Sequence, residues 1–540
     1  MSHDLVSVRA SLRRLRIDVN DAKEPVSRSR EIALVVALAG FFVFFGGGNL
    51  DLGPIEARQG LAAGERFGPL GLVCGGWEPG LWPARVLPSQ VWAWCEGEVT
   101  AASVRWPDAI AAGLLGLLLA RRLALVLGAR AGVMAGLCLF GGLAWIDRSA
   151  GARVDLISAL AVVGALDRIL SKGSDRVAGL WAAFAVLAGG WPPLAMILLP
   201  IVILGRPGRT LSRGLLVPPL LALAAWSVWA LSAASTQAWA AALAWPLTQG
   251  PAWSLPLWVV GFSLPWGPFA VLAAWRSVRD RGTPEVPPLI LGWLQITGVA
   301  VLAGTLVPGL AGPGRITALV GLALTAAAGL DAAWCGLAET GARRTFVAVS
   351  VTVVLLWTAL VASLGSYLAV AVSYYRPLAT VLVIAGVLTA IAAIVAVRGR
   401  RQRWLIGALV MVSVCLKLAH WGYYVPEWNY RRSQGPWGRA VGQWVPTNWP
   451  LHTLHAWPTD LAFYTGRPVR ALDLPDLRLL QATPPERPMF FLLQPEEYGF
   501  WSERLELIKL REMLDERGEP RIVARTPGEL NRRRRPIRTD

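Results

Sequence analysis

Long apolar runs separated by short polar stretches make up most of the sequence. A membrane-spanning helix needs about 20 predominantly apolar residues. The two runs at 177–190 and 192–204 are short, and the letters "GGWPP" at 189–193 separate them where a turn is expected. The pattern predicts thirteen spans, at 32–48, 107–127, 131–146, 154–170, 177–190, 192–204, 214–232, 254–275, 287–307, 314–335, 345–363, 378–397 and 404–422.

The composition agrees with this pattern. Of the 540 residues, 54% are hydrophobic and 16% are charged. A soluble domain carries about 25% charged residues. The sequence therefore predicts an all-α polytopic membrane protein.

The net charge of +17 suggests nucleic-acid binding, but the positions of the arginines argue against it. They gather in the N-terminal arm and in alternate short loops, as the positive charges of cytoplasmic loops do. We therefore expect no nucleic-acid partner and a multi-pass protein of the plasma (inner) membrane. The N-terminus is expected in the cytoplasm, and an odd number of spans places the C-terminus outside. The alternate loops hold Arg121, Arg122, Arg130, Lys172, Arg176, Arg206, Arg209, Arg213, Arg276, Arg279, Arg281, Arg343, Arg344, Arg398, Arg400, Arg401 and Arg403.

Two long segments, 49–106 and 423–540, face the exterior in this topology. In the second, "RPMFFLLQPEEY" predicts a buried strand beside a turn. The stretch "SERLELIKLREMLDERG" has apolar residues at helical spacing and ends in glycine, which predicts a helix. The expected organisation is a cytoplasmic arm at 1–31, a transmembrane domain at 32–422, a small exterior α/β domain at 423–525 and a basic disordered tail at 526–540.

Segment 49–106 carries many charged residues with tryptophans interleaved among them. One interpretation is an interfacial loop in which tryptophans anchor the chain and the charges are solvated. The other is a site at the membrane surface, where carboxylates act on a substrate whose lipid tail stays in the bilayer. The charged residues are Asp51, Glu56, Arg58, Glu65, Arg66, Glu78, Arg85, Glu96, Glu98 and Arg105.

Two further places have side chains that suit chemistry. Arg153 and Asp155 lie where the fourth span begins, and ionisable groups near the bilayer are usually paired or functional. A salt bridge at a helix end is the alternative explanation. His452 and His455 have a spacing that occurs in metal sites, although two ligands alone are a weak signal.

Six motifs occur in the order found in the polyprenyl-phosphate-dependent glycosyltransferases of the GT-C superfamily. The sequence most resembles the protein mannosyltransferase and aminoarabinose transferase group, which is glycosyltransferase family 39-like. The resemblance extends over most of the chain. The motifs are "GPIEARQGLAAGERFGP", "GGWEPGLWPARVLPSQVWAW", "RWPDAIAAGLLGLLLARRLALVLGARAG", "GARVDLIS", "GFSLPWGPFAVLAAWRSVRD" and "DLAFYTGRPVRALD".

The resemblance implies a GT-C fold and transfer of a sugar from a polyprenyl-phosphate donor to an acceptor on the outer face of the membrane. The acceptor would be a lipid, a glycan or a protein. A carboxylate would deprotonate the acceptor hydroxyl, and cations or a metal would stabilise the departing phosphate. The resemblance does not identify a cofactor, and a divalent cation is one candidate. The implied catalytic residues are Asp51, Glu56 and Asp155, and the implied substrate-binding residues are Arg58, Glu78, Arg85, Arg153 and Arg315.

The sequence departs from the group at several active-site positions. Ile55 stands where the group has its first catalytic aspartate, and Pro79 and Trp191 stand where it has lysines. Arg315 is the only cation in "VPGLAGPGR", where the group carries lysines. Either the site has been rebuilt from other residues, or the protein is a degenerate homologue that serves as a scaffold or subunit of a membrane complex.

If the protein is active, another carboxylate must replace the one missing at Ile55. Asp51 lies four residues earlier and would share a face with Ile55 if the helix extended that far. Pro54 favours a helix start at that point, which would leave Asp51 in the preceding loop. A loop carboxylate near Arg58 can still act as a base, so we expect Asp51 to take the role ahead of Glu56 and Asp155.

Overall fold

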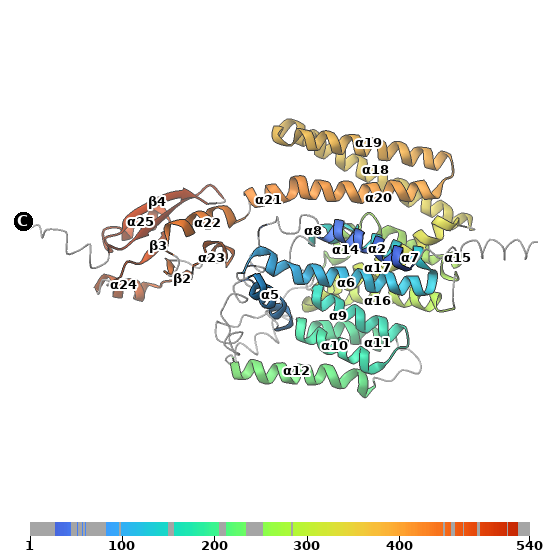
Figure 1. Cartoon of the computed structure of the whole chain (residues 1–540), viewed down its shortest axis with the longest axis horizontal. Coiled ribbons are helices and arrows are strands. Elements are labelled where there is room, and N and C mark those ends of the chain that lie inside the picture. Colours follow the sequence, from blue (N-terminus) through green and yellow to red (C-terminus); the bar gives the residue numbers. More distant parts are fainter. Residues whose placement is uncertain are drawn as a thin grey trace, which may run out of the picture.

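The structure is a computed structural model with a bundle of apolar helices and a C-terminal α/β domain at one end of it (Figure 1). We call the end that carries this domain the domain end and the opposite one the remote end. The structure describes residues 28–44, 51, 57, 60, 83–96, 99–148, 156–204, 212–233, 252–281, 284–337, 339–431, 433–446, 449–454, 459–467, 469–482, 487–515 and 517–527.

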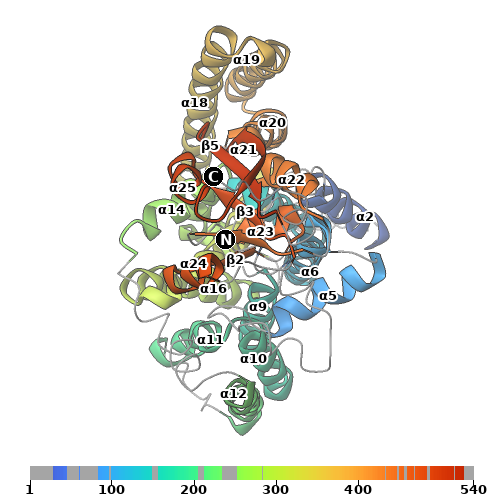
Figure 2. The same cartoon turned by 90° about the vertical axis from the view of Figure 1, so that its left-hand side faces the viewer.

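A helix lies in each of the predicted apolar segments. Figure 2, seen from the side of the C-terminal domain, places α12 and the α18–α19 hairpin at opposite edges of the bundle. The helices are α2 (Arg28–Ala39), which continues as η1 (Gly40–Phe44), α5 (Pro83–Glu96), α6 (Ala101–Leu127), α7 (Ala129–Phe140), α8 (Leu143–Arg148), α9 (Leu156–Leu170), α10 (Asp175–Gly189), α11 (Trp191–Ile203), α12 (Arg213–Ala233), α14 (Leu255–Phe262), η2 (Gly267–Ala274), α15 (Arg276–Arg279), α16 (Val286–Leu306), η3 (Pro308–Leu310), α17 (Ala311–Cys335), α18 (Thr340–Ala371), η4 (Ser373–Tyr375), α19 (Arg376–Arg398), α20 (Gln402–Ala419), η5 (His420–Tyr424) and α21 (Val425–Arg431).

The predicted number of thirteen spans is not confirmed. Among the described residues, six helices are long and apolar enough to cross a membrane, or seven if the α14–η2 pair, bent by 97°, counts as one span. Four further stretches whose side chains the structure describes are apolar helical stretches of 10–17 residues. These shorter helices are Ile32–Val43, Ala129–Phe140, Trp191–Ile203 and Arg213–Ala225.

Helix α17 lies deepest in the bundle, with 94% of its most apolar window buried. Its small residues allow close approach to α16. A Cβ added to Gly314 would lie 2.7 Å from the carbonyl oxygen of Ala300, and one added to Gly321 would lie 3.1 Å from that of Trp293. Small residues at helix contacts are typical of membrane bundles, where close packing replaces the hydrophobic effect.

A buried polar link joins three parts of the bundle. The indole N–H of Trp266 donates to Oγ of Ser413 at 2.9 Å, and the Ser413 hydroxyl donates to the carbonyl oxygen of Gly141 at 2.9 Å. The backbone N–H of Leu143 donates to the carbonyl oxygen of Leu264 at 2.8 Å. These bonds satisfy backbone groups that the α7–α8 break and the bend after α14 leave without helical partners.

The C-terminal domain contains a five-stranded mixed sheet in the order β2-β1-β3-β5-β4. Strand β1 pairs in parallel with β2 and β3, and β5 pairs antiparallel with β3 and β4. All four residues of β3 are buried, which confirms the strand predicted in "RPMFFLLQPEEY". The elements are α22 (Gly435–Trp444), β1 (Leu451–Thr453), α23 (Thr459–Thr465), β2 (Val469–Ala471), α24 (Leu474–Ala482), β3 (Phe490–Leu493), α25 (Pro495–Trp501), β4 (Ile508–Leu514) and β5 (Pro520–Arg525).

The helix predicted in "SERLELIKLREMLDERG" is wrong. The middle of that stretch forms β4, which pairs with β5 from Ile508–Arg525 to Leu514–Pro520. Its apolar residues fit helical spacing and interrupted alternation equally well, and a bulge between Lys509 and Arg511 shifts the alternation. Pairing with the buried strand β5 decides the structure, because β-propensity depends on context more than helix propensity does.

Candidate functional site

Asp51 connects the segment after the first helix to three other elements. Its backbone N–H donates to Oδ1 of Asn429 in α21 at 2.8 Å, and its carbonyl oxygen accepts from Nη2 of Arg105 in α6 at 2.9 Å. Its carboxylate accepts a 2.7 Å hydrogen bond from Oγ of Ser433 and lies 3.5 Å from Nη1 of Arg439 in α22. We call these five residues the Asp51 junction.

The start of α22 is shaped to receive this carboxylate. The backbone N–H of Gly435 donates to Oγ of Ser433 at 2.8 Å, which leaves the hydroxyl proton of Ser433 for Asp51. A Cβ added to Gly435 would lie 2.6 Å from Oδ2 of Asp51, closer than real Cβ atoms approach. Glycine is therefore required here by the close approach of the carboxylate.

The first turns of α6 bury two charged side chains at the domain end. Arg105 is 4% exposed and Asp108 is 3% exposed, and their spacing places them on one face of the helix. A capping box between Thr100 and Ser103 fixes where α6 begins. The Asp51 junction therefore rests on a buried cation whose position is set by a well-defined helix start.

A second contact joins the segment after the first helix to the C-terminal domain. Ala57 and Val104 are fully buried in a small apolar cluster that Phe463 of α23 packs against. A Cβ on Gly60 would lie 2.7 Å from the ring of Phe463 and 3.1 Å from Val104. Two independent contacts thus hold part of segment 49–106 against both α6 and the C-terminal domain.

A cavity of about 500 Å³ lies beside the Asp51 junction, in the C-terminal domain. Arg439 forms part of its wall, and its guanidinium carbon lies 5.1 Å from the centre of the Tyr464 ring. Arg467 also lines the cavity, but it donates to the carbonyl oxygens of Val445 at 2.9 Å and Gly442 at 3.0 Å. The wall therefore offers two aromatic side chains, amide and hydroxyl groups, and the exposed cation of Arg439. The lining residues are Arg439, Gly442, Gln443, Trp444, Val445, Pro446, Tyr464, Thr465 and Arg467.

Of the residues predicted for the site, Asp51 and Arg315 have described side chains. Asp51 is not helical, as the proline at position 54 predicted. Arg85 lies in the first turn of α5. The predicted meeting of Asp51, Glu56, Glu78 and Asp155 around one opening is not tested. The residues that lie outside the described part of the chain are Glu56, Arg58, Glu78, Arg153 and Asp155, together with Ile55 and Pro79.

Arg315 lies in the second turn of α17, at the domain end, and is half-buried. Its guanidinium carbon lies 5.1 Å from the centre of the Trp258 ring in α14. Trp258 in turn stacks on Phe262, with centroids 4.4 Å apart. A cation over an aromatic face keeps its charge while its N–H donors remain available for a ligand.

Lys417, which no motif in the sequence singled out, is the most deeply buried of the described lysines. It is 2% exposed and lies on α20, whose first turn is at the remote end, so that Lys417 is close to the domain end. No described acidic residue forms an ion pair with it. A lone lysine inside an apolar run was the signal that could have revealed it, because such charges are costly and usually functional.

A row of rings leads from Lys417 towards the Asp51 junction. His420 stacks on Tyr424 with centroids 5.1 Å apart, and Tyr424 lies 5.9 Å from Trp428, the neighbour of Asn429. Residues 420–424 form a π-helical segment, a rare conformation that is frequent at functional sites. The rings of His420, Tyr424 and Trp428 thus extend along the chain from the end of α20 to the residue before Asn429.

His452, one of the two histidines whose spacing is a weak signal for a metal site, is held within the C-terminal sheet. Its Nδ1 lies 3.1 Å from the carbonyl oxygen of Phe490 in the neighbouring strand, and burial lowers the pKa of its ring. His455 lies outside the described residues. Across the described ranges, no three His, Cys, Asp or Glu side chains gather as metal ligands would, so we derive no step through a metal.

The residues of the site combine a carboxylate that can act as a base with cations that can stabilise a bound anion such as a phosphate. Asp51 offers a carboxylate that two donors hold in place, and Arg105, Arg315, Arg439 and Lys417 supply positive charge near the domain end. A carboxylate accepts protons from hydroxyl groups, and preorganised cations stabilise a departing phosphate.

In sequence, the chain matches no protein-family model and no curated protein. In structure, it is similar to ArnT from Cupriavidus metallidurans bound to undecaprenyl phosphate, with a TM-score of 0.72 and 17% identity over 93% of this chain and 99% of that one. The apo state of the same protein gives a TM-score of 0.69 and 19% identity over 92% and 97%. The chain therefore has the fold of ArnT, and the GT-C resemblance predicted from its motifs is confirmed at the level of the fold.

Proposed function

We propose that the protein is a membrane glycosyltransferase that moves a sugar from a polyprenyl-phosphate-linked donor to an acceptor hydroxyl. The observation that carries the proposal is the Asp51 junction, which holds a carboxylate between α6 and the C-terminal domain at one end of an ArnT-like bundle. That ArnT was captured with undecaprenyl phosphate supports a lipid phosphate as the donor.

In the proposed reaction, Asp51 takes the proton of the acceptor hydroxyl. The acceptor oxygen forms a bond to the anomeric carbon of the sugar, and the bond from that carbon to the phosphate oxygen breaks. Polyprenyl phosphate leaves with the electron pair. Lys417 and Arg315, both at the domain end, stabilise its charge in place of the lysines missing at 79 and 191. The cavity beside Arg439 receives the acceptor.

The topology belongs to the same proposal. We place the domain end and the acceptor on the outer face of the plasma membrane and the N-terminal arm inside, because the arginines alternate between loops. Glu56, Arg58, Glu78, Arg85, Arg153 and Asp155 are assigned to the donor and acceptor sites by the motif resemblance alone.

One observation favours a second function. Both carboxylate oxygens of Asp51 already have partners in the chain, Ser433 and Arg439, as they would in a structural tie. In a degenerate homologue acting as a scaffold or subunit, this tie would hold the C-terminal domain in place and no transfer would occur.

The test is transfer in proteoliposomes with a panel of lipid-linked sugars, for the parent and for Asp51→Asn. Loss of a general base lowers the rate by about 100-fold or more. Ser433→Ala serves as the control, because it removes one contact of the tie, leaves the carboxylate and does not line the cavity. Equal losses in both variants would make Asp51 structural, and no transfer by the parent with any donor would favour the scaffold.

A further inference from the structure

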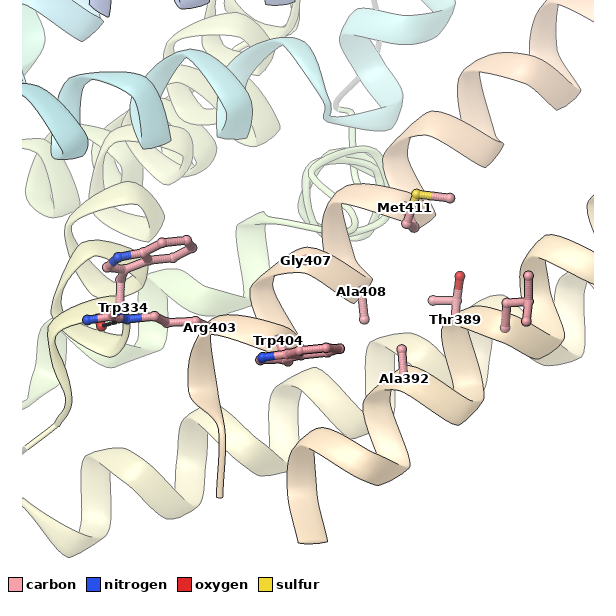
Figure 3. Close-up of a pocket in the computed structure, with 9 residues that line it drawn as sticks. Trp334, Thr389, Ala392, Arg403, Trp404, Gly407, Ala408 and Met411 are labelled. Atoms are coloured by element: carbon pink, nitrogen blue, oxygen red, sulfur yellow. Dashed lines mark hydrogen bonds between the residues drawn. The ribbon is translucent and has the colours of Figure 1, made fainter. Parts of the chain in front are cut away.

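A cavity of about 500 Å³ opens at the remote end of the bundle, far along α20 from the Asp51 junction (Figure 3). Its walls come from the end of α17, the second half of α19 and the first turns of α20. Leu388 and Met411 line it and are 61% and 45% exposed. In a membrane-spanning bundle, side chains so exposed along a span face lipid.

The walls of the cavity are apolar. Ala392 and Ala408 have small side chains that leave space in the cavity, and a Cβ added to Gly407 would meet nothing within 4 Å. The hydroxyl of Thr389 donates to the carbonyl oxygen of Ala385 at 2.7 Å, so it presents no unsatisfied donor to the cavity. The chemistry of this wall matches a hydrocarbon chain.

The mouth of the cavity is built from arginine and tryptophan. Arg403 donates from Nε to the carbonyl oxygen of Trp334 at 3.3 Å, and its guanidinium carbon lies 5.6 Å from the centre of the Trp334 ring. Arg401 lies over Trp404 at 5.8 Å. Tryptophan rings of this kind lie at the level of lipid headgroups. The contacts orient both guanidinium groups and leave most of their donors for a ligand.

Positive charge at this mouth has no acidic counterpart in the described part of the chain. Arg398, Arg400, Arg401 and Arg403 lie within six residues, and none forms an ion pair there. Nearby Asp331 is already paired with Arg130 at 2.7 Å and with Arg281 at 3.7 Å. Arg400 has a φ of 53°, a conformation that glycine or asparagine adopts more easily. The turn between α19 and α20 therefore concentrates positive charge that a bound anion would neutralise.

We propose that this cavity is a binding site for an anionic glycerophospholipid of the leaflet at the remote end. One acyl chain lies against Gly407, Ala408 and Met411, and the phosphate accepts hydrogen bonds from Arg403 and Arg401. Basic pockets between spans bind anionic headgroups through this combination of charge and apolar wall. The site is distinct from the donor and acceptor sites proposed at the domain end.

The experiment uses the full-length protein and native mass spectrometry. Phosphatidylglycerol and phosphatidylcholine with identical chains are compared, and the parent is expected to retain the anionic lipid more strongly. Arg403→Gln should reduce that preference by about tenfold, the loss expected for one charge-assisted hydrogen bond. Gly407→Phe should fill the cavity and reduce retention of both lipids.

The matched control is Arg344→Gln, which removes an exposed cation from the first turns of α18, at the same end. It should leave lipid preference unchanged. Equal retention of the two lipids by the parent, or equal effects of Arg344→Gln and Arg403→Gln, would overturn the proposal. Displacement of phosphatidylglycerol by undecaprenyl phosphate at Arg403 would overturn it too, and would make the cavity a donor-lipid site.

Discussion

The hydroxyl of Ser433 donates a 2.7 Å hydrogen bond to Oδ2 of Asp51, although 382 positions separate the two residues in the chain. This bond and the Asn429 contact join the first loop of the bundle to the turn that precedes α22. The position of the C-terminal domain over the bundle therefore depends on a polar contact near the domain end as well as on apolar packing.

Replacing Ser433 by alanine should loosen this junction. A hydrogen bond to a charged group contributes about 1.5–3 kcal/mol. Hydrogen exchange of the amides in α21 and α22 should therefore accelerate by about tenfold or more. The control is Ser502→Ala, since the hydroxyl of Ser502 makes only an exposed 3.3 Å hydrogen bond to the carbonyl oxygen of Gly499. Unchanged exchange in Ser433→Ala would show that the bond adds nothing to docking.

Gly435→Ala should damage the same junction by sterics. The added methyl group would lie 2.6 Å from Oδ2 of Asp51, so the carboxylate or the start of α22 must move. We expect a destabilisation of about 1–3 kcal/mol, as for overpacking elsewhere, measured as a lower melting temperature in detergent. Gly499→Ala is the control, because a Cβ there meets nothing within 4 Å. Equal melting temperatures for the two variants would contradict the close approach.

Lys417→Met separates stability from function. Methionine has a similar length and no charge, so it removes a buried cation that no described acid neutralises, and stability should be unchanged or higher. Transfer should fall by at least about tenfold if the cation stabilises the departing phosphate. Lys509→Met, at an exposed lysine paired with Glu512, should leave both stability and transfer activity unchanged. Full transfer activity in Lys417→Met would remove Lys417 from the site.

The stability of the C-terminal sheet should depend on pH through His452. Burial lowers the pKa of this ring in the folded protein, so folding favours the neutral form. The stability that His452 contributes is fully present above the pKa of about 6.5 that its ring has in the unfolded chain. That stability is lost as the pH falls towards the lowered pKa of the folded protein. The protection of the β1 and β3 amides, measured as the exchange rate relative to the intrinsic rate at each pH, should therefore fall between neutral and mildly acidic pH. In His452→Gln this dependence should disappear, and its persistence there would assign it to another group.

The topology can be tested by labelling cysteines introduced at positions 20 and 478 after the native cysteines are replaced by serine. A membrane-impermeant reagent added to intact cells should label position 478 and leave position 20 unlabelled, because the arginine-rich loops are expected inside. Label on both positions, or on position 20 alone, would be incompatible with the proposed orientation.

The sequence predicted the helical segments well, because each apolar run forms its own helix whatever its neighbours do. It failed where pairing between distant segments decides the structure. Strand β4 was predicted as a helix because Leu507, Leu510 and Met513 follow a helical spacing, whereas its alternation is broken by a bulge and the deciding partner is β5.

The candidate site was predictable only in part for the same reason. Asp51 was identified from its position after the first span, but its partners Asn429, Ser433 and Arg439 follow nearly 400 residues later and belong to no local pattern. Lys417 could have been found from the sequence, since one charge within an apolar run is a recognised signal.

The deep burial of α17 has a consequence for the biogenesis of the protein. Its small residues serve contact with α16, and its mean hydropathy is 1.7, against 2.7 for α19, which faces outward along much of its length. A helix of this kind is stabilised less by contact with lipid than by packing against its neighbouring helix. Because only four residues, which include η3, lie between α16 and α17, the two helices are suited to enter the membrane together as a hairpin. A substitution that widens their contact, such as Gly321→Leu, would then act during synthesis, by hindering insertion, before it acted on the folded protein.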